Sequence, residues 1–112
     1  AGDWYCFISG TASIRGEKST NALSPQQQAR QTIENIRYLI SKENLKRHAC
    51  PAVSLDLCNL RVYIKDKAFY EEIRSIVEAE FPDVPAVYLV TDICRTELLV
   101  EMEGICICRQ KN

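Results

Sequence analysis

Residues 57–81, LCNLRVYIKDKAFYEEIRSIVEAEF, decide the fold class of this 112-residue chain. Up to position 65, leucine, valine and isoleucine alternate with asparagine, arginine and tyrosine, and this two-residue period predicts a strand with one buried face. Asp66 then precedes apolar residues that recur three or four positions apart, which predicts a helix over 67–81 capped by Asp66. A strand followed directly by an amphipathic helix indicates a domain in which helices cover a sheet.

The segments on either side predict one more helix and three more strands. Aromatic and β-branched residues over 3–14 favour a strand, as do the compositions of 86–91 and 98–109. The run Ser24-Pro25-Gln26-Gln27 places serine, proline and glutamine where they start a helix, and the apolar stripe behind it predicts a helix that ends near Asn44. Polar connectors are expected at 15–23, 46–51 and 92–97.

We therefore predict a single α+β domain over residues 1–112, with two layers: a mixed sheet, and two helices on one of its faces. The other face then carries Arg61 and Tyr63 from one strand and Glu101 and Glu103 from another. A sheet face with this mixture is neither a core nor an ordinary surface. We expect it to pair with a second copy of the chain.

Charge and cysteine content limit the partners and the compartment. The 14 Lys and Arg residues balance 15 Asp and Glu residues, so the basic excess of nucleic-acid binders is missing and we expect no nucleic-acid partner. No apolar run approaches the ~20 residues of a membrane span, so we expect no membrane partner. The six cysteines lie mostly in strand-like runs, and the single histidine, His48, is not spaced with them as a zinc ligand would be. We expect reduced cysteines in a cytoplasmic protein that uses no metal and no other cofactor.

Two glutamates on the last predicted strand are candidate acid–base groups. Glu101 and Glu103 are two positions apart and therefore share a face, beside apolar neighbours. Partial desolvation would raise the pKa of one carboxyl group and suit it to general acid or base catalysis. The alternative is that one or both glutamates form structural salt bridges with Arg61 or Arg95.

The connector before that strand offers a candidate anchor for a carboxylate ligand. The Arg95 guanidinium has the geometry to hold a carboxylate with two hydrogen bonds, and the alternative is an exposed loop arginine. Cys94 has no base near it in the sequence, so we interpret it as lining a pocket. Tyr88 either offers an orienting hydroxyl to this pocket or packs as a core or interface aromatic. In Ser9-Gly10-Thr11, the glycine indicates close approach of a ligand to the backbone, or a bulge.

Several runs resemble the YjgF/RidA family over residues 4 to 109. They are Phe7-Ile8-Ser9-Gly10, the helix with Gln28, Thr32 and Asn35, the strand Arg61-Val62-Tyr63-Ile64-Lys65-Asp66 and the final Val100-Glu101-Met102-Glu103-Gly104. The resemblance implies a chorismate-mutase-like fold and a homotrimer with clefts between its subunits. It also implies hydrolysis of amino-acid enamines or imines to 2-keto acids and ammonia, the activity of the best-known members. Older labels call members of the family endoribonucleases or translation inhibitors.

Two features depart from the imine deaminases of this family. Their carboxylate-binding arginine, early in the third strand, would fall within 85–87, where this chain has Pro-Ala-Val. This departure argues against imine hydrolysis. Family members also begin with one more strand, so we expect residues 1–112 to form the domain without its usual first strand.

Residues 87–101 are similar to the C-terminal, YjgF-like half of the chorismatases, through the runs Asp92-Ile93-Cys94-Arg95 and Glu97-Leu98-Leu99-Val100-Glu101. The similarity implies that Glu101 is the catalytic acid or base and that Arg95 holds a substrate carboxylate. It implies a pocket also lined by Cys94, Tyr88 and Arg61. We therefore predict an enzyme domain, a lyase or hydrolase of the chorismatase type, that acts on a carboxylate-bearing, chorismate-like metabolite. The alternatives are an enamine or imine deaminase, and a non-catalytic trimer that binds metabolites or partner proteins.

Overall fold

The computed structural model of the chain describes residues 4–12, 14–15, 18–19, 24–47, 54–91, 93 and 98–109. Its main sheet has four strands in the order β1-β6-β4-β5, with the bounds Trp4–Thr11 (β1), Val100–Arg109 (β6), Ser54–Ile64 (β4) and Ala86–Val90 (β5). Strand β6 runs antiparallel to both neighbours, whereas β5 runs parallel to β4. The predicted mixed sheet of an α+β domain is confirmed.

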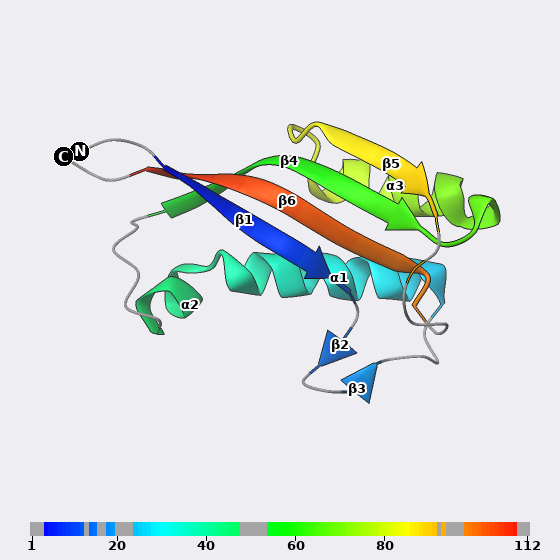
Figure 1. The fold of residues 1–112 in the computed structure, drawn as a ribbon, viewed down its shortest axis with the longest axis horizontal. Helices are drawn as coiled ribbons and strands as arrows, with labels where there is room; N and C mark the ends of the chain where they lie inside the picture. Colours follow the sequence, from blue (N-terminus) through cyan, green and yellow to red (C-terminus); the bar gives the residue numbers. More distant parts are fainter. Residues whose placement is uncertain are drawn as a thin grey trace.

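Two helices, α1 (Pro25–Leu39) and α3 (Tyr70–Glu80), pack on one face of this sheet (Figure 1). Between them and the sheet lies the core, in which alternate residues of each strand meet the apolar stripes of the helices. Its fully buried side chains include Ile33, Ile36, Leu60, Val62, Ile64, Ile73, Val100 and Met102. Within the described ranges, no helix combines the length and the apolar character that crossing a membrane requires.

Helix α1 begins where the sequence predicts it. The Ser24 hydroxyl accepts a hydrogen bond from the Gln27 backbone N–H (3.2 Å), and the Gln27 side chain accepts one from the Ser24 backbone N–H (3.0 Å). This reciprocal pair satisfies two backbone donors that the first helical turn leaves open.

The same helix ends earlier than predicted, at Leu39 instead of near Asn44. A second helix, α2 (Lys42–Arg47), follows it. The Ser41 hydroxyl donates to the Tyr38 carbonyl (2.7 Å) and accepts from the Asn44 backbone N–H (3.2 Å), so this serine starts a new helix.

The structure also differs from the prediction in strand β4 and around the expected connector at 15–23. Strand β4 begins at Ser54, three residues early, because its first residues pair with the end of β6, and Cys58 is an extra residue at a bulge. In the connector, β2 (Ile14–Arg15) and β3 (Lys18–Ser19) form a small antiparallel ladder.

Asp66 caps the segment after β4, as predicted. Its carboxylate accepts a hydrogen bond from the Ala68 backbone N–H (2.9 Å). The first turn is a 3₁₀ helix, η1 (Lys67–Phe69), and α3 begins at Tyr70, so the predicted single helix is two consecutive ones.

The second face of the main sheet is exposed, and we call it the open face. Its most exposed apolar side chains are Tyr5 (65%) and Phe7 (78%) of β1, and Val87 (56%) and Leu89 (41%) of β5. The strand period places Ser9, Asn59, Arg61, Tyr63, Glu101, Glu103 and Ile105 on this same face.

Candidate functional site

The sheet register gathers the two candidate glutamates and their predicted neighbours on the open face. Glu101 is directly opposite Tyr63, and Glu103 is directly opposite Arg61. Residues that are directly opposite in neighbouring strands project to the same side of the sheet. The prediction that these four side chains share one sheet face is confirmed.

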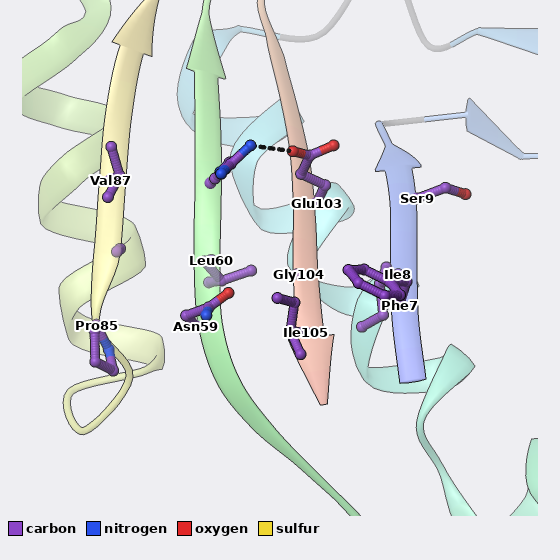
Figure 2. A pocket seen from close by; sticks show the side chains of 12 residues that line it. Phe7, Ile8, Ser9, Asn59, Leu60, Pro85, Val87, Glu103, Gly104 and Ile105 are labelled. Carbon is purple, nitrogen blue, oxygen red and sulfur yellow. Dashed lines mark hydrogen bonds and ion pairs between the residues drawn. The ribbon is translucent and has the colours of Figure 1, made fainter. Parts of the chain in front are cut away.

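A groove of about 560 Å³ lies along the open face. Figure 2 shows Glu103 and Ile105 on β6, with Phe7 and Ser9 on the neighbouring β1 and Asn59 on β4. Arg61, Val87 and Pro85 complete its wall on the side of β4 and β5. Its volume lies in the range of small-molecule pockets, and its lining combines apolar side chains with a charged pair.

The charged pair in the groove is engaged. The Tyr63 hydroxyl donates a hydrogen bond to Glu103 Oε1 (2.7 Å), and the Arg61 guanidinium lies 3.5 Å from the same oxygen. The hydrogen bond to Glu103 is the main reason why the pKa of Tyr63 lies above its ordinary value of 10.0. For Glu103, the structural ion pair with Arg61 that the sequence left open is therefore present.

Glu101 lies next to this cluster and has a different environment. Its carboxylate occupies the space beside Gly10, where a Cβ atom on residue 10 would overlap Oε1. The register of β1 against β6 shifts between Ile8 and Thr11, so Gly10 lies in the irregular part of β1. Among the described residues, the half-buried Glu101 side chain has no hydrogen bond and no ion pair. The two glutamates therefore separate into an engaged carboxylate and one that remains available.

The two ends of the connector that contains Cys94 and Arg95 lie near the end of β1. Ile93 and Leu98 are buried together with Ala12, which follows β1 directly. Because Gly10 is two residues before Ala12, both ends of the connector belong to the part of the sheet where Glu101 lies. Cys94 and Arg95 themselves are outside the described residues.

Tyr88 lies on the opposite face of the sheet from Glu101. It is paired with the fully buried Val62, and its ring packs against Tyr70 of α3 in an edge-to-face contact with 5.7 Å between ring centroids. Burial raises the pKa of Tyr88, and its buried hydroxyl has no partner among the described residues. The chain therefore does not bring Tyr88 together with Arg61 and Glu101, and the tyrosine takes the alternative place among the core side chains.

Sequence reasoning did not single out the apolar lining of the groove. Phe7, Ile105 and Val87 line it. Val87 is directly opposite Arg61, Ile105 is directly opposite Asn59, and Phe7 is directly opposite Ile105. The sequence does contain a signal for Ile105, because the two-residue strand period places it on the same face as Glu103. The burial of neighbouring residues decides which phase of each strand faces outward, and this depends on long-range pairing.

Two of the free cysteines lie opposite each other on the helix side of the sheet. Cys6, Cys58 and Cys106 are free thiols, and Cys6 is directly opposite Cys106 on the helix side of the sheet. Burial raises the pKa of the Cys106 thiol to about 11. Cys106 is therefore a protonated core side chain at neutral pH.

No protein-family model matches the chain. Two curated proteins of Streptomyces hygroscopicus are similar to it in sequence. A 3-hydroxybenzoate synthase is 38% identical over 102 residues, and a chorismatase is 34% identical over 102 residues. Both alignments cover 88% of this chain and 30% of the relative. The chain thus spans less than a third of the length of the curated relatives that it matches.

Solved structures give the fold. A crystal structure of a chorismatase matches with a TM-score of 0.79 and 30% identity, over 90% of this chain and 31% of that one. The YjgF gene product of E. coli matches with a TM-score of 0.71 at 17% identity, over 94% and 81% of the two chains. The predicted resemblance is confirmed: the chain has a 3-hydroxybenzoate synthase and a chorismatase among its sequence homologues, and its fold is the YjgF fold in a divergent form.

Proposed function

We propose that this chain, with its YjgF fold and its chorismatase homologues, is an enzyme domain that acts on a carboxylate-bearing, chorismate-like metabolite. In this proposal Glu101 is the catalytic acid or base, and Arg95 holds a carboxylate of the substrate. Arg61 and Cys94 contribute to the walls of the pocket. No metal or organic cofactor takes part.

One observation supports Glu101 over Glu103 as the reacting group. The Glu103 carboxylate already accepts the Tyr63 hydroxyl at 2.7 Å and lies 3.5 Å from the Arg61 guanidinium, so it is engaged within the chain. Glu101 is half-buried beside Gly10, and its carboxylate has no such partner in the described part of the chain. A carboxyl group without a fixed partner is free to exchange a proton with a substrate oxygen or with water.

The chemistry needs positioning of the substrate and proton transfer to and from one carboxyl group. The Arg95 guanidinium would orient the ring of the substrate through a carboxylate. In a hydrolysis, Glu101 would protonate the oxygen whose bond to carbon breaks, water would add to that carbon, and the added water would return a proton to the Glu101 carboxylate. The neighbouring groove supplies an apolar wall from Phe7, Val87 and Ile105, which suits a ring with charged substituents.

A second part of the proposal is self-association through the open face. Four large apolar side chains of this face are between 41% and 78% exposed in the single chain. Exposed apolar side chains around a polar centre are typical of a surface that another protein covers. We propose a homotrimer, in which the open face of each copy meets its neighbours and the clefts between copies hold the substrate.

The test is turnover of chorismate by the purified chain, followed by separation of the products. We expect Glu101→Gln to lower kcat by about 10²–10⁴-fold, which is the usual contribution of a general acid or base. Glu71→Gln, an exposed glutamate on α3, is the matched control and should keep the wild-type rate. Equal rates for wild type and Glu101→Gln would refute the assigned role.

A parallel assay with an amino-acid imine generated in solution separates the other candidate activities. Turnover of the imine without turnover of chorismate would favour the deaminase. Turnover of neither, together with binding of benzoate that Glu101→Gln leaves unchanged, would favour a non-catalytic trimer.

A further inference from the structure

Gln28 is a fully buried polar residue on the apolar side of helix α1. Its neighbours on that side, Ala29, Ile33 and Ile36, are equally buried and are apolar. Among the described residues, Gln28 and Thr32 are the buried polar side chains of the chain. A primary amide is stable in such a place only if hydrogen bonds replace its lost water.

The side chain of Gln28 reaches across the chain to a backbone group. Its Oε1 accepts a hydrogen bond from the backbone N–H of Leu99, at 2.8 Å, over 71 positions of sequence. The carbonyl of Leu99 in turn accepts a hydrogen bond from the backbone N–H of Lys65 (3.0 Å). The peptide groups on both sides of the Leu99 Cα are therefore held, one by a side chain of α1 and the other by Lys65, the residue that follows β4.

The position of Leu99 affects the strand that carries Glu101. It immediately precedes β6, and Glu101 follows two residues later. Val100, between them, is fully buried opposite Ile64, so a shift at Leu99 passes directly into the first residues of β6. The position of the Glu101 carboxylate over Gly10 depends on this register.

We propose that Gln28 is a positioning residue for Glu101. Through the Leu99 N–H it fixes where β6 starts, and thereby the distance between the Glu101 carboxylate and the bound substrate. The inference rests on the proposed function, because it assigns to Gln28 a role in the reaction of Glu101. A misplacement of about 1 Å is enough to lower a rate by about 10²-fold.

Three variants and one control test this role. Gln28→Met keeps the length of the side chain and removes the acceptor. Gln28→Asn keeps the amide but is one methylene too short to reach Leu99. Gln28→Glu keeps both the reach and an acceptor oxygen, and Gln26→Met makes the same change at an exposed glutamine of the same helix.

The first measurement is hydrogen exchange of the Leu99 amide by NMR, which requires no enzymatic activity. We expect exchange to become at least about tenfold faster in Gln28→Met and Gln28→Asn, and to remain slow in Gln28→Glu and Gln26→Met. Unchanged exchange in both Gln28→Met and Gln28→Asn would overturn the inference.

The second measurement is the kinetics of chorismate turnover. We expect kcat to fall by about 10- to 100-fold in Gln28→Met and Gln28→Asn while KM changes less than about threefold, and Gln28→Glu to recover most of the loss. A kcat within about threefold of wild type in both variants would overturn the inference. Wild-type protein that turns over neither chorismate nor an imine refutes the proposed function instead, and the exchange measurement then decides on the contact by itself.

Discussion

At the scale of single residues, Gly10 and Glu101 form the most informative contact of the candidate site. The Glu101 carboxylate takes the space that any side chain at position 10 would need. The absence of a side chain at residue 10 is therefore a condition for the place of the acid. No such condition applies to Glu103, which Tyr63 and Arg61 hold.

Gly10→Ala tests this contact. The new methyl group would push the flexible end of Glu101 aside, so we expect kcat for the substrate to fall by about 10- to 100-fold. The free energy of unfolding should change by less than about 1 kcal/mol, because residue 10 is exposed and alanine restricts the unfolded chain more than glycine. Turnover kinetics and urea unfolding measure the two effects. Undiminished kcat would show that the carboxylate does not act from this position.

The contact between Tyr63 and Glu103 predicts a change in a tyrosine titration. The pKa of Tyr63 is raised chiefly by its hydrogen bond to Glu103, while Arg61 acts in the opposite direction. In Glu103→Ala the raising effect is lost and Arg61 remains, so Tyr63 should ionise at lower pH than in the wild type. Ultraviolet absorbance of tyrosinate follows this, and Tyr63→Phe identifies the step that belongs to Tyr63. A titration that Glu103→Ala leaves unchanged would speak against the hydrogen bond.

Sequence patterns were sufficient for some of these residues and insufficient for others. The two-residue period placed Arg61, Tyr63, Glu101 and Glu103 on one face, and the sheet register confirms it. The strand period did not distinguish the two glutamates, because the Tyr63 hydroxyl bonds to the diagonal Glu103 and not to Glu101, which is directly opposite. The sequence pattern also did not determine from which face of the sheet Tyr88 projects, since this depends on the parallel pairing of β5 with β4.

At the scale of elements, β6 contributes side chains both to the core and to the open face of the sheet. Its even-numbered residues from Val100 to Cys106 point into the core, and its odd-numbered residues form the centre of the open face. The site therefore depends on the packing of the helix side, which includes the buried Cys106 thiol.

Cys106 predicts a loss of stability at alkaline pH. The thiol has a pKa of about 11 in the folded chain and an ordinary value of 9.0, so it favours the folded state fully below pH 9. Above that pH the unfolded thiol ionises while the folded one stays protonated, and the contribution is lost as the pH rises through about 11. The loss amounts to at most about 1.4 kcal/mol per pH unit.

Urea unfolding at about pH 8.5 and about pH 10 measures this effect. We expect the free energy of unfolding to fall more steeply with pH in the wild type than in Cys106→Ala. Equal slopes in the two proteins would mean that the thiol ionises in the folded chain as easily as in water.

The elements were predictable where one local signal dominates. Ser24 and Gln27 set the start of α1, and the alternation of Leu60, Val62 and Ile64 identifies β4. Boundaries failed where a second local signal competes. The Ser41 hydroxyl divides the expected long helix, and the bulge at Cys58 lets β4 pair with β6 beyond the region of clear alternation.

At the scale of the whole molecule, the open face exposes large apolar side chains to solvent in the single chain. Phe7 alone is 78% exposed on a strand whose other side is core. Light scattering after size exclusion should give a mass three times the 12.8 kDa of one chain.

Phe7→Asp should shift this mass toward that of one chain, because a charge in the apolar part of the face opposes its burial. Tyr38→Asp makes the same kind of change at an aromatic residue of α1 that is 43% exposed and lies outside this face, and it should remain trimeric. A wild-type mass of 12.8 kDa at concentrations of tens of micromolar would contradict self-association.

The most direct measurement is a crystal structure of the protein soaked with benzoate, a small ring that carries one carboxylate. We predict that the carboxylate of benzoate lies within hydrogen-bond distance of the Arg95 guanidinium, and that its ring lies beside Glu101 above Gly10. Benzoate bound away from both side chains would contradict the proposed site. So would a structure without bound benzoate in which the Arg95 and Glu101 side chains point away from each other.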